Sequence, residues 1–202
     1  MVTRRVTIID YGLGNLRSVT KGLEKAGAAV RVSSDPEEIV SADGIVIPGV
    51  GAFREGMEML GDLRRSVTAS AGSIPVLGIC LGMQMLLTTS EEHGLHQGLN
   101  LIPGHVRRFE RVRGMKIPHM GWNSLIVERD HPLLEGIGTG DYMYFVHSYH
   151  ATTHAEYTLT WTEYADRFSS TIYHGDVFGV QYHPEKSGRT GLRLLKNFID
   201  LL

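Results

Sequence analysis

The chain has 202 residues, of which 42% are hydrophobic and 21% charged, and its formal net charge is −2. This length and composition predict one globular domain over residues 1–202, and the near-neutral charge argues against a nucleic-acid-binding protein. No apolar run reaches the ~20 residues of a membrane span, and Asp10 ends the first apolar stretch too early for a signal peptide. We therefore expect a cytoplasmic protein that binds neither nucleic acids nor membranes.

In the first half of the chain, short apolar runs alternate with helical patterns. These runs predict strands at 6–9, 30–32, 45–47 and 76–79, and the first, closed by Asp10-Tyr11-Gly12, is expected to be buried on both faces. Between them, 16–26 has helical spacing, with Asn15 placed to cap its start and Gly27 to end it. Further helices are predicted over 57–67 and from Met83 onward. This alternation indicates right-handed βαβ units and therefore an α/β fold with a parallel sheet.

The second half has denser β-type segments, separated by Gly, Asp and Pro. They are expected to form hairpins and antiparallel additions to the sheet, at 106–109, 125–127, 142–146, 157–161, 170–173 and 177–182. Residues 190–202 form a final helical pattern. The predicted fold is an open sheet with a mostly parallel centre, antiparallel additions and helices on both faces.

Cys80 is the strongest candidate for a functional residue. It stands in Gly78-Ile79-Cys80-Leu81-Gly82, a G-x-C-x-G pattern between a predicted strand and a predicted helix. That context is the thiol version of a nucleophile elbow, in which the backbone N–H of Leu81 is placed to stabilise an oxyanion. A lone cysteine is more often a buried hydrophobic residue, but the strand–turn–helix setting favours a nucleophile.

A thiol nucleophile needs a base, and His183 is the best placed of the ten histidines. It follows a predicted strand and precedes Pro184, while Glu185 is close enough to orient the imidazole ring. By itself this pair is more simply a strand-end histidine beside a solvated glutamate. The second oxyanion donor is expected from Val50 or Gly51 in the turn Pro48-Gly49-Val50-Gly51, which is also a plausible strand-to-helix turn without a catalytic role.

Three other features carry little weight. Gly12-Leu13-Gly14 lacks the third glycine of a dinucleotide fingerprint, so no cofactor is expected. His147 and His150 are an odd number of residues apart on a predicted strand, which points them to opposite faces, so no metal site is expected. The basic stretch 107–116 is predicted to be a solvated face, or the border of a partner or an anionic substrate.

The sequence resembles the class I glutamine amidotransferases through Gly78-Ile79-Cys80-Leu81-Gly82-Met83-Gln84 and His183-Pro184-Glu185. The segments 10–16, 48–53, 118–123, 144–149 and 183–187 narrow this resemblance to the glutaminase subunits of imidazole glycerol phosphate synthase, of histidine biosynthesis. It covers nearly the whole chain and implies a flavodoxin-like open sheet.

The resemblance implies glutamine as substrate and Cys80, His183 and Glu185 as the catalytic triad. It implies oxyanion donors at Leu81 and at Val50 or Gly51, and substrate contacts from Gln84, Glu92, Ser148 and Tyr149. The implied partner is a (β/α)₈-barrel cyclase, with Trp122, Asn123, Tyr144 and Lys186 facing it along the ammonia passage. We further expect the turn Pro48–Gly51 to rest with an N–H turned away and to rotate when the partner binds its ligand.

Three alternatives remain open at this stage. Another class I glutaminase, serving vitamin B6, tryptophan or nucleotide synthesis, shares the triad, although the motifs around Trp122 and Asp10–Asn15 argue against it. A flavodoxin-like cysteine peptidase or deglycase lacks the pairing of His183-Pro184-Glu185 with Gln84. A scaffold without catalytic activity does not account for an intact triad.

Overall fold

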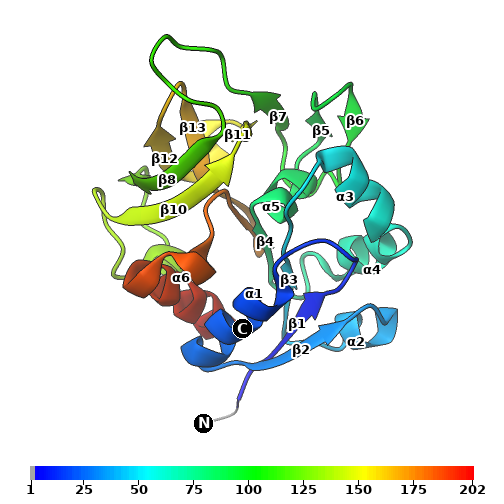
Figure 1. Cartoon of the computed structure of the whole chain (residues 1–202). Helices are drawn as coiled ribbons and strands as arrows, with labels where there is room; N and C mark the ends of the chain where they lie inside the picture. Colours follow the sequence, from blue (N-terminus) through cyan, green and yellow to red (C-terminus); the bar gives the residue numbers. More distant parts are fainter. Residues whose placement is uncertain (1–2) are drawn as a thin grey trace.

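The computed structural model describes residues 3–202, arranged around a large twisted sheet (Figure 1). This sheet has eight strands in the order β2-β1-β3-β4-β14-β13-β12-β9. Their bounds are β1 (Arg5–Ile9), β2 (Ala29–Ser33), β3 (Gly44–Ile47), β4 (Val76–Ile79), β9 (Ile126–Val127), β12 (Thr158–Glu163), β13 (Arg167–His174) and β14 (Val177–Val180).

The first five strands in this order are mutually parallel, and β13, β12 and β9 are antiparallel additions. The four strands predicted in the first half are found within one residue of their predicted bounds. The mostly parallel centre is therefore confirmed. The prediction was wrong for β14, which was grouped with the antiparallel additions but lies parallel to β4.

Helices cover both faces of the large sheet, as predicted. Side chains on one face pack against α1 and α6, and those on the other pack against the remaining helices. The helices are α1 (Leu16–Ala26), α2 (Pro36–Val40), α3 (Phe53–Leu60), α4 (Leu63–Ser70), α5 (Leu81–Leu86) and α6 (Gly188–Asp200), with 3₁₀ turns η1 (Pro132–Leu134), η2 (Ala155–Tyr157) and η3 (Pro184–Lys186). Successive residues of a strand alternate between the two faces, and the parallel strands β1, β3, β4 and β14 each contribute to both hydrophobic layers.

Local sequence signals explain the ends of α1. Asn15 accepts a hydrogen bond from the backbone N–H of Ser18 at 3.3 Å, and Gly27 ends the helix in a left-handed conformation. The single helix predicted over 57–67 is wrong. Gly61 adopts φ 48° and separates α3 from α4, a conformation that glycine adopts more readily than other residues.

Two smaller sheets stand beside the large one and were not separated in the prediction. One pairs β8 (His119–Ser124) with β10 (Tyr142–His147), and the other has the order β11-β7-β5-β6. The strands of the second are β5 (Thr89–Ser90), β6 (His96–Gln97), β7 (His105–Arg108) and β11 (Tyr149–Thr152). Figure 1 shows both above the carboxyl ends of the parallel strands, where they form the far wall of the site.

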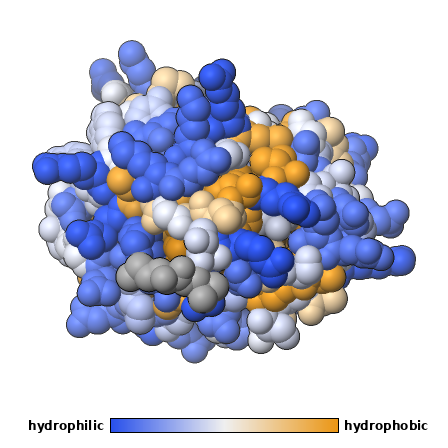
Figure 2. Space-filling view, turned by 90° about the horizontal axis from the view of Figure 1, so that it is seen from below, coloured by the Kyte–Doolittle hydropathy of each residue, from blue (hydrophilic) through white to orange (hydrophobic). Residues whose placement is uncertain are grey.

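The opposite end of the molecule is largely hydrophilic, with smaller hydrophobic areas between the polar side chains (Figure 2). Within residues 3–202, no helix combines the length and the apolar character needed to cross a membrane.

Candidate active site

Cys80 lies between the end of β4 and the start of α5, at the carboxyl edge of the sheet. Its backbone is held at φ 55° and ψ −104°, a conformation that is uncommon for a residue with a side chain. Such strain persists only when the surrounding structure enforces it. Here the N–H of Cys80 donates to Val180 O at 2.8 Å and its carbonyl accepts from Gln84 N at 3.1 Å.

The glycine that follows in the motif is required by close packing. A Cβ atom on Gly82 would lie 1.9 Å from the carbonyl oxygen of Ile47, at the end of β3. The first turn of α5 is thereby pressed against β3, which brings the turn Pro48–Gly51 close to the thiol. The strand–turn–helix geometry predicted around Cys80 is present.

His183 and Glu185 form a buried pair beside Cys80. The two side chains are 3% and 1% exposed, and His183 Nδ1 lies 2.8 Å from Glu185 Oε1. Because an ionised carboxylate only accepts hydrogen bonds, Nδ1 carries the proton and donates it to Glu185. The other ring nitrogen, Nε2, is left for the thiol. The three side chains predicted as a triad are therefore brought together.

Opposing effects act on the pKa of His183. Burial alone lowers it, whereas the neighbouring Cys80 and Glu185 raise it, and the net result is a pKa of about 9. A raised pKa makes the imidazole a stronger base toward the thiol proton, and the carboxylate keeps its ring oriented.

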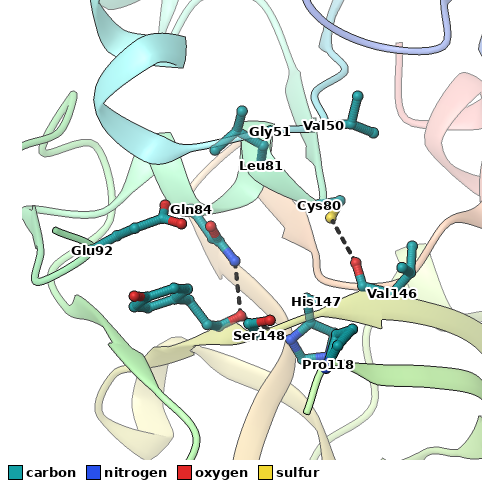
Figure 3. A pocket seen from close by; sticks show the side chains of 11 residues that line it. Val50, Gly51, Cys80, Leu81, Gln84, Glu92, Pro118, Val146, His147 and Ser148 are labelled. Carbon is teal, nitrogen blue, oxygen red and sulfur yellow. Dashed lines mark hydrogen bonds between the residues drawn. The ribbon is translucent and has the colours of Figure 1, made fainter.

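The thiol opens onto a cavity of about 330 Å³ between α5 and the two smaller sheets (Figure 3). All four predicted substrate contacts line it, together with Cys80 and the predicted oxyanion residues: Val50, Gly51, Leu81, Gln84, Glu92, Ser148 and Tyr149. Glu92 comes from the loop after β5, and its Oε2 accepts from Phe53 N at 2.6 Å. The cavity therefore combines a nucleophile with hydrogen-bond acceptors at the opposite wall.

The two predicted oxyanion donors do not converge in this structure. The N–H of Leu81 is directed to the carbonyl oxygen of Gly49, 3.4 Å away. In a planar trans peptide the C=O and the following N–H point in opposite directions, so the N–H of Val50 points away from that of Leu81. The space where an oxyanion would bind is taken by the Gly49 carbonyl.

Tyr11 fixes the preceding peptide of this turn. Its hydroxyl donates to Pro48 O at 2.5 Å, and its side chain is only 5% exposed. Burial, and to a smaller extent the nearby Cys80, raises the pKa of Tyr11. A Cβ atom on Gly49 would lie 2.5 Å from that hydroxyl and 2.8 Å from Leu81 Cβ, so only glycine fits there.

Three of the four predicted partner-facing residues form one surface group. Trp122 on β8 is opposite Tyr144 on β10, with ring centroids 6.1 Å apart, and Lys186 Nζ lies 6.0 Å from the Tyr144 ring. Asn123 lies on the other face of β8, where its amide donates to Glu163 O at 2.9 Å. The structure therefore does not group Asn123 with the other three.

One argument about the histidines is wrong. His147 and His150 do not point to opposite faces, since both rings pack against Phe109, with centroid distances of 5.2 and 4.5 Å. The regular alternation fails because β10 ends at His147 and β11 begins at Tyr149. Among residues 3–202, no three His, Cys, Asp or Glu side chains are grouped to hold a metal ion.

Sequence reasoning missed several residues around the cavity. Pro118, Val146 and His147 line it, and Val146 O lies 3.9 Å from Cys80 Sγ. Gln181, fully buried, has its Nε2 3.7 Å from Cys80 Sγ. Gln181 stands two residues before His183, and alternate residues of an extended segment lie on the same side, so the sequence could have indicated that Gln181 lies near the thiol.

Comparison with known proteins agrees with this arrangement. The family model for class-I glutamine amidotransferases matches residues 7–201, and the chain belongs to that family. A crystal structure of a glutamine amidotransferase superposes with a TM-score of 0.75 at 18% identity, covering 96% of this chain and 97% of the other.

Within this family the chain belongs with the imidazole glycerol phosphate synthase subunits HisH. It is 55% identical to the HisH subunit of Natronomonas pharaonis, over 98% of this chain and 95% of the relative. It is 52% identical to that of Methanosarcina mazei, over 98% and 99%. The predictions of the family, of the fold and of an enzyme of this class are confirmed.

Proposed function

We propose that the chain hydrolyses glutamine to glutamate and ammonia and passes the ammonia to a (β/α)₈-barrel cyclase subunit of histidine biosynthesis. The products of the complex would be imidazole glycerol phosphate and aminoimidazole carboxamide ribotide. The observation that carries the proposal is the strained Cys80, beside the buried His183–Glu185 pair, at the end of a cavity lined by Gln84. The match to the HisH subunits supports the same assignment.

In the proposed chemistry Cys80 Sγ attacks the side-chain amide carbon of glutamine. A C–S bond forms, and His183 first accepts the thiol proton and then gives it to the departing nitrogen, so that ammonia leaves as the C–N bond breaks. Water, deprotonated by His183 Nε2, attacks the resulting glutamyl thioester and releases glutamate and the free thiol. Glu185 keeps the imidazole oriented throughout.

The tetrahedral intermediates need donors for the oxyanion, and we propose the N–H groups of Leu81 and Val50 for this role. In the resting state the Gly49 carbonyl accepts from Leu81 N, and the Val50 N–H points away. Rotation of the Gly49–Val50 peptide would replace that carbonyl with the Val50 N–H. A partner that favours the rotated turn would activate the glutaminase, which couples ammonia release to its use.

For substrate binding we propose Gln84, Glu92 and the backbone around Ser148 and Tyr149. The Gln84 amide donates through Nε2 to Tyr149 O at 2.9 Å, and in Figure 3 its nitrogen points to that carbonyl. Its oxygen and the carboxylate of Glu92 are therefore available to accept from the α-amino group of glutamine.

The proposed docking surface for the cyclase is the group formed by Trp122, Tyr144 and Lys186. Trp122 is 56% exposed, and the neighbouring Met120 and Tyr142 are 63% and 57% exposed. Exposed apolar and aromatic side chains gathered on one pair of strands are typical of an interaction surface. A dry passage there would keep ammonia from being protonated in water.

We also infer that residues 1–202 form one amidotransferase domain, which the match over 7–201 supports. A cytoplasmic location is proposed because a lone catalytic thiol is suited to a reducing compartment.

The function is tested by reconstitution with the barrel subunit and its nucleotide substrate. Glutamate release and imidazole glycerol phosphate formation are measured together, with glutamine or with ammonium salt as the nitrogen source. We expect one glutamate per product molecule, and little glutamate without the barrel and its ligand. Absence of glutamine-dependent product while ammonium salt still supports the cyclase would contradict the proposal. Equal glutaminase activity with and without the partner would contradict the proposed rotation of the turn.

A further inference from the structure

A buried chain of hydrogen bonds connects β8 to the catalytic thiol, and neither the family resemblance nor the proposed mechanism accounts for it. Its members lie on β8, β10, β11 and α5 and just after the ends of β14 and β4. In order they are Asn123, His119, His147, Tyr149, Gln84, Gln181 and Cys80.

The protonation of His147 follows from its contact with a backbone carbonyl. His147 Nδ1 lies 2.8 Å from Tyr149 O, and because a carbonyl only accepts, Nδ1 carries the proton. In a neutral ring the other nitrogen is then a bare acceptor. His147 Nε2 lies 3.1 Å from His119 Nδ1, so the proton of that hydrogen bond belongs to His119.

The opposite end of this series of hydrogen bonds independently places the His119 proton on the same nitrogen. Asn123 Oδ1 accepts from Ser124 N at 2.8 Å, which identifies the other atom of the amide as the donor nitrogen. That nitrogen lies 3.3 Å from His119 Nε2, so Nε2 is bare and the His119 proton is again on Nδ1. Every hydrogen bond from Asn123 to Tyr149 therefore points in one direction.

Both rings are suited to stay neutral. His119 is 3% exposed and His147 is 6% exposed. Burial lowers the pKa of His119 to about 4, and burial together with the neighbouring His119 lowers that of His147 well below its usual value.

At the cavity, Tyr149 O receives two donors, one from His147 and one from Gln84. The second proton of Gln84 Nε2 is directed to Gln181 Oε1 at 3.2 Å, and Gln181 Nε2 lies 3.7 Å from Cys80 Sγ. A carboxamide has nearly the same shape when its oxygen and nitrogen are exchanged, so only its partners fix its orientation. Here they direct the nitrogen of Gln84 inward and leave its oxygen for a ligand.

We propose that His119 and His147 are positioning residues for substrate binding. The hydrogen bonds from His119 to His147 and from His147 to the Tyr149 carbonyl hold that carbonyl in place. The carbonyl in turn orients the Gln84 amide with its oxygen toward the amino group of the substrate. This inference rests on the proposed function, because it takes glutamine as the ligand of the cavity. The two histidines do not touch the reacting atoms, and their contribution is to ground-state binding.

Two substitutions at each histidine separate polarity from packing. In Asn, the amide nitrogen takes the position of Nδ1 and retains the donor. In Gln, the amide reaches the position of Nε2, so the donor at Nδ1 is lost although the side chain is closer to histidine in size. A purely structural role predicts that Gln is tolerated at least as well as Asn, whereas the proposed role predicts the reverse.

In the complete complex we expect H119Q and H147Q to raise KM for glutamine by about tenfold, the scale of one lost buried hydrogen bond. Their kcat should fall by no more than about threefold, because the interaction acts on binding. The KM values of H119N and H147N should rise by less than about threefold. A Gln variant with a KM as low as that of its Asn counterpart, or a loss confined to kcat, would overturn the proposal.

A second measurement needs neither variants nor substrate. Two-bond ¹H–¹⁵N correlation spectra of the ¹⁵N-labelled wild-type chain at neutral pH report the tautomer of each imidazole. We expect the neutral Nδ1–H form for both His119 and His147, and an Nε2–H form in either ring would overturn the proposal. If glutamine were not the substrate, the kinetic comparison would show no glutaminase in wild type, while the tautomers would still test the chain of hydrogen bonds.

Discussion

Replacing Glu185 with Gln keeps the shape of the carboxylate and removes its charge from the buried pair with His183. The amide can donate to Nδ1, which would place the imidazole proton on the wrong nitrogen for catalysis. For the equivalent change in a serine triad, the loss in kcat is about 10⁴, and we expect a fall of about 10²–10⁴ here. Little of this loss should appear in KM, because Glu185 does not line the cavity.

The same substitution changes the dependence of stability on pH. The pKa of His183 rises from 6.5 to about 9 in the folded chain, which corresponds to up to about 3 kcal/mol of stabilisation. Because the folded pKa is the higher one, this contribution is fully present below pH 6.5 and is lost as the pH rises through about 9. In E185Q the raising effect of Cys80 on the pKa of His183 remains and that of the carboxylate is lost, so this high-pH loss should shrink.

Urea unfolding of wild type and E185Q, followed from about pH 6 to about pH 10, measures this difference directly. A surface control is E58Q, which removes an exposed pair between Glu58 and Arg54 on α3 and should alter neither kcat nor the pH profile. An E185Q variant with wild-type kcat and an unchanged pH profile of stability would refute the account of the pair.

Two further predictions follow from the turn and from the exposed strands. G49A places a Cβ atom 2.5 Å from the Tyr11 hydroxyl and should lower partner-stimulated glutamate release by at least about tenfold. The control G138A, with open space around its Cβ, should leave the rate unchanged. Equal rates for the two variants would contradict the role of the turn. W122A removes a side chain that is 56% exposed, so it should leave urea unfolding nearly unchanged. In titration calorimetry it should weaken cyclase binding at least tenfold, whereas V40A, at an exposed position on α2, should not. Unchanged binding by W122A would exclude Trp122 from the interface.

The position of the catalytic edge was predictable from sequence because it depends on local patterns. Short apolar strands alternating with helices imply a parallel sheet, and such a sheet gathers its strand ends on one edge. Cys80 and the turn at Gly49 follow two neighbouring strands, so their proximity required no knowledge of long-range contacts. The cap at Asn15 and the stop at Gly27 were equally local.

The predictions failed where distant segments decide the arrangement. The break between β10 and β11 reverses the alternation that separated His147 from His150, and no local composition marks it. Gln181 and His119 enter the site through contacts with residues 101 and 28 positions away, respectively. The direction of the Gly49 carbonyl could not be predicted from the local sequence either, because glycine allows both orientations of the next peptide.

The central claim is that Cys80 is the nucleophile that releases ammonia from glutamine. Its most direct test is glutamate release by C80A in the complete complex, with ammonium-dependent cyclase activity as the control for assembly. The account predicts that C80A loses at least about 10³-fold in glutamate release and keeps full ammonium-dependent activity. Glutamate release by C80A within tenfold of wild type would contradict it.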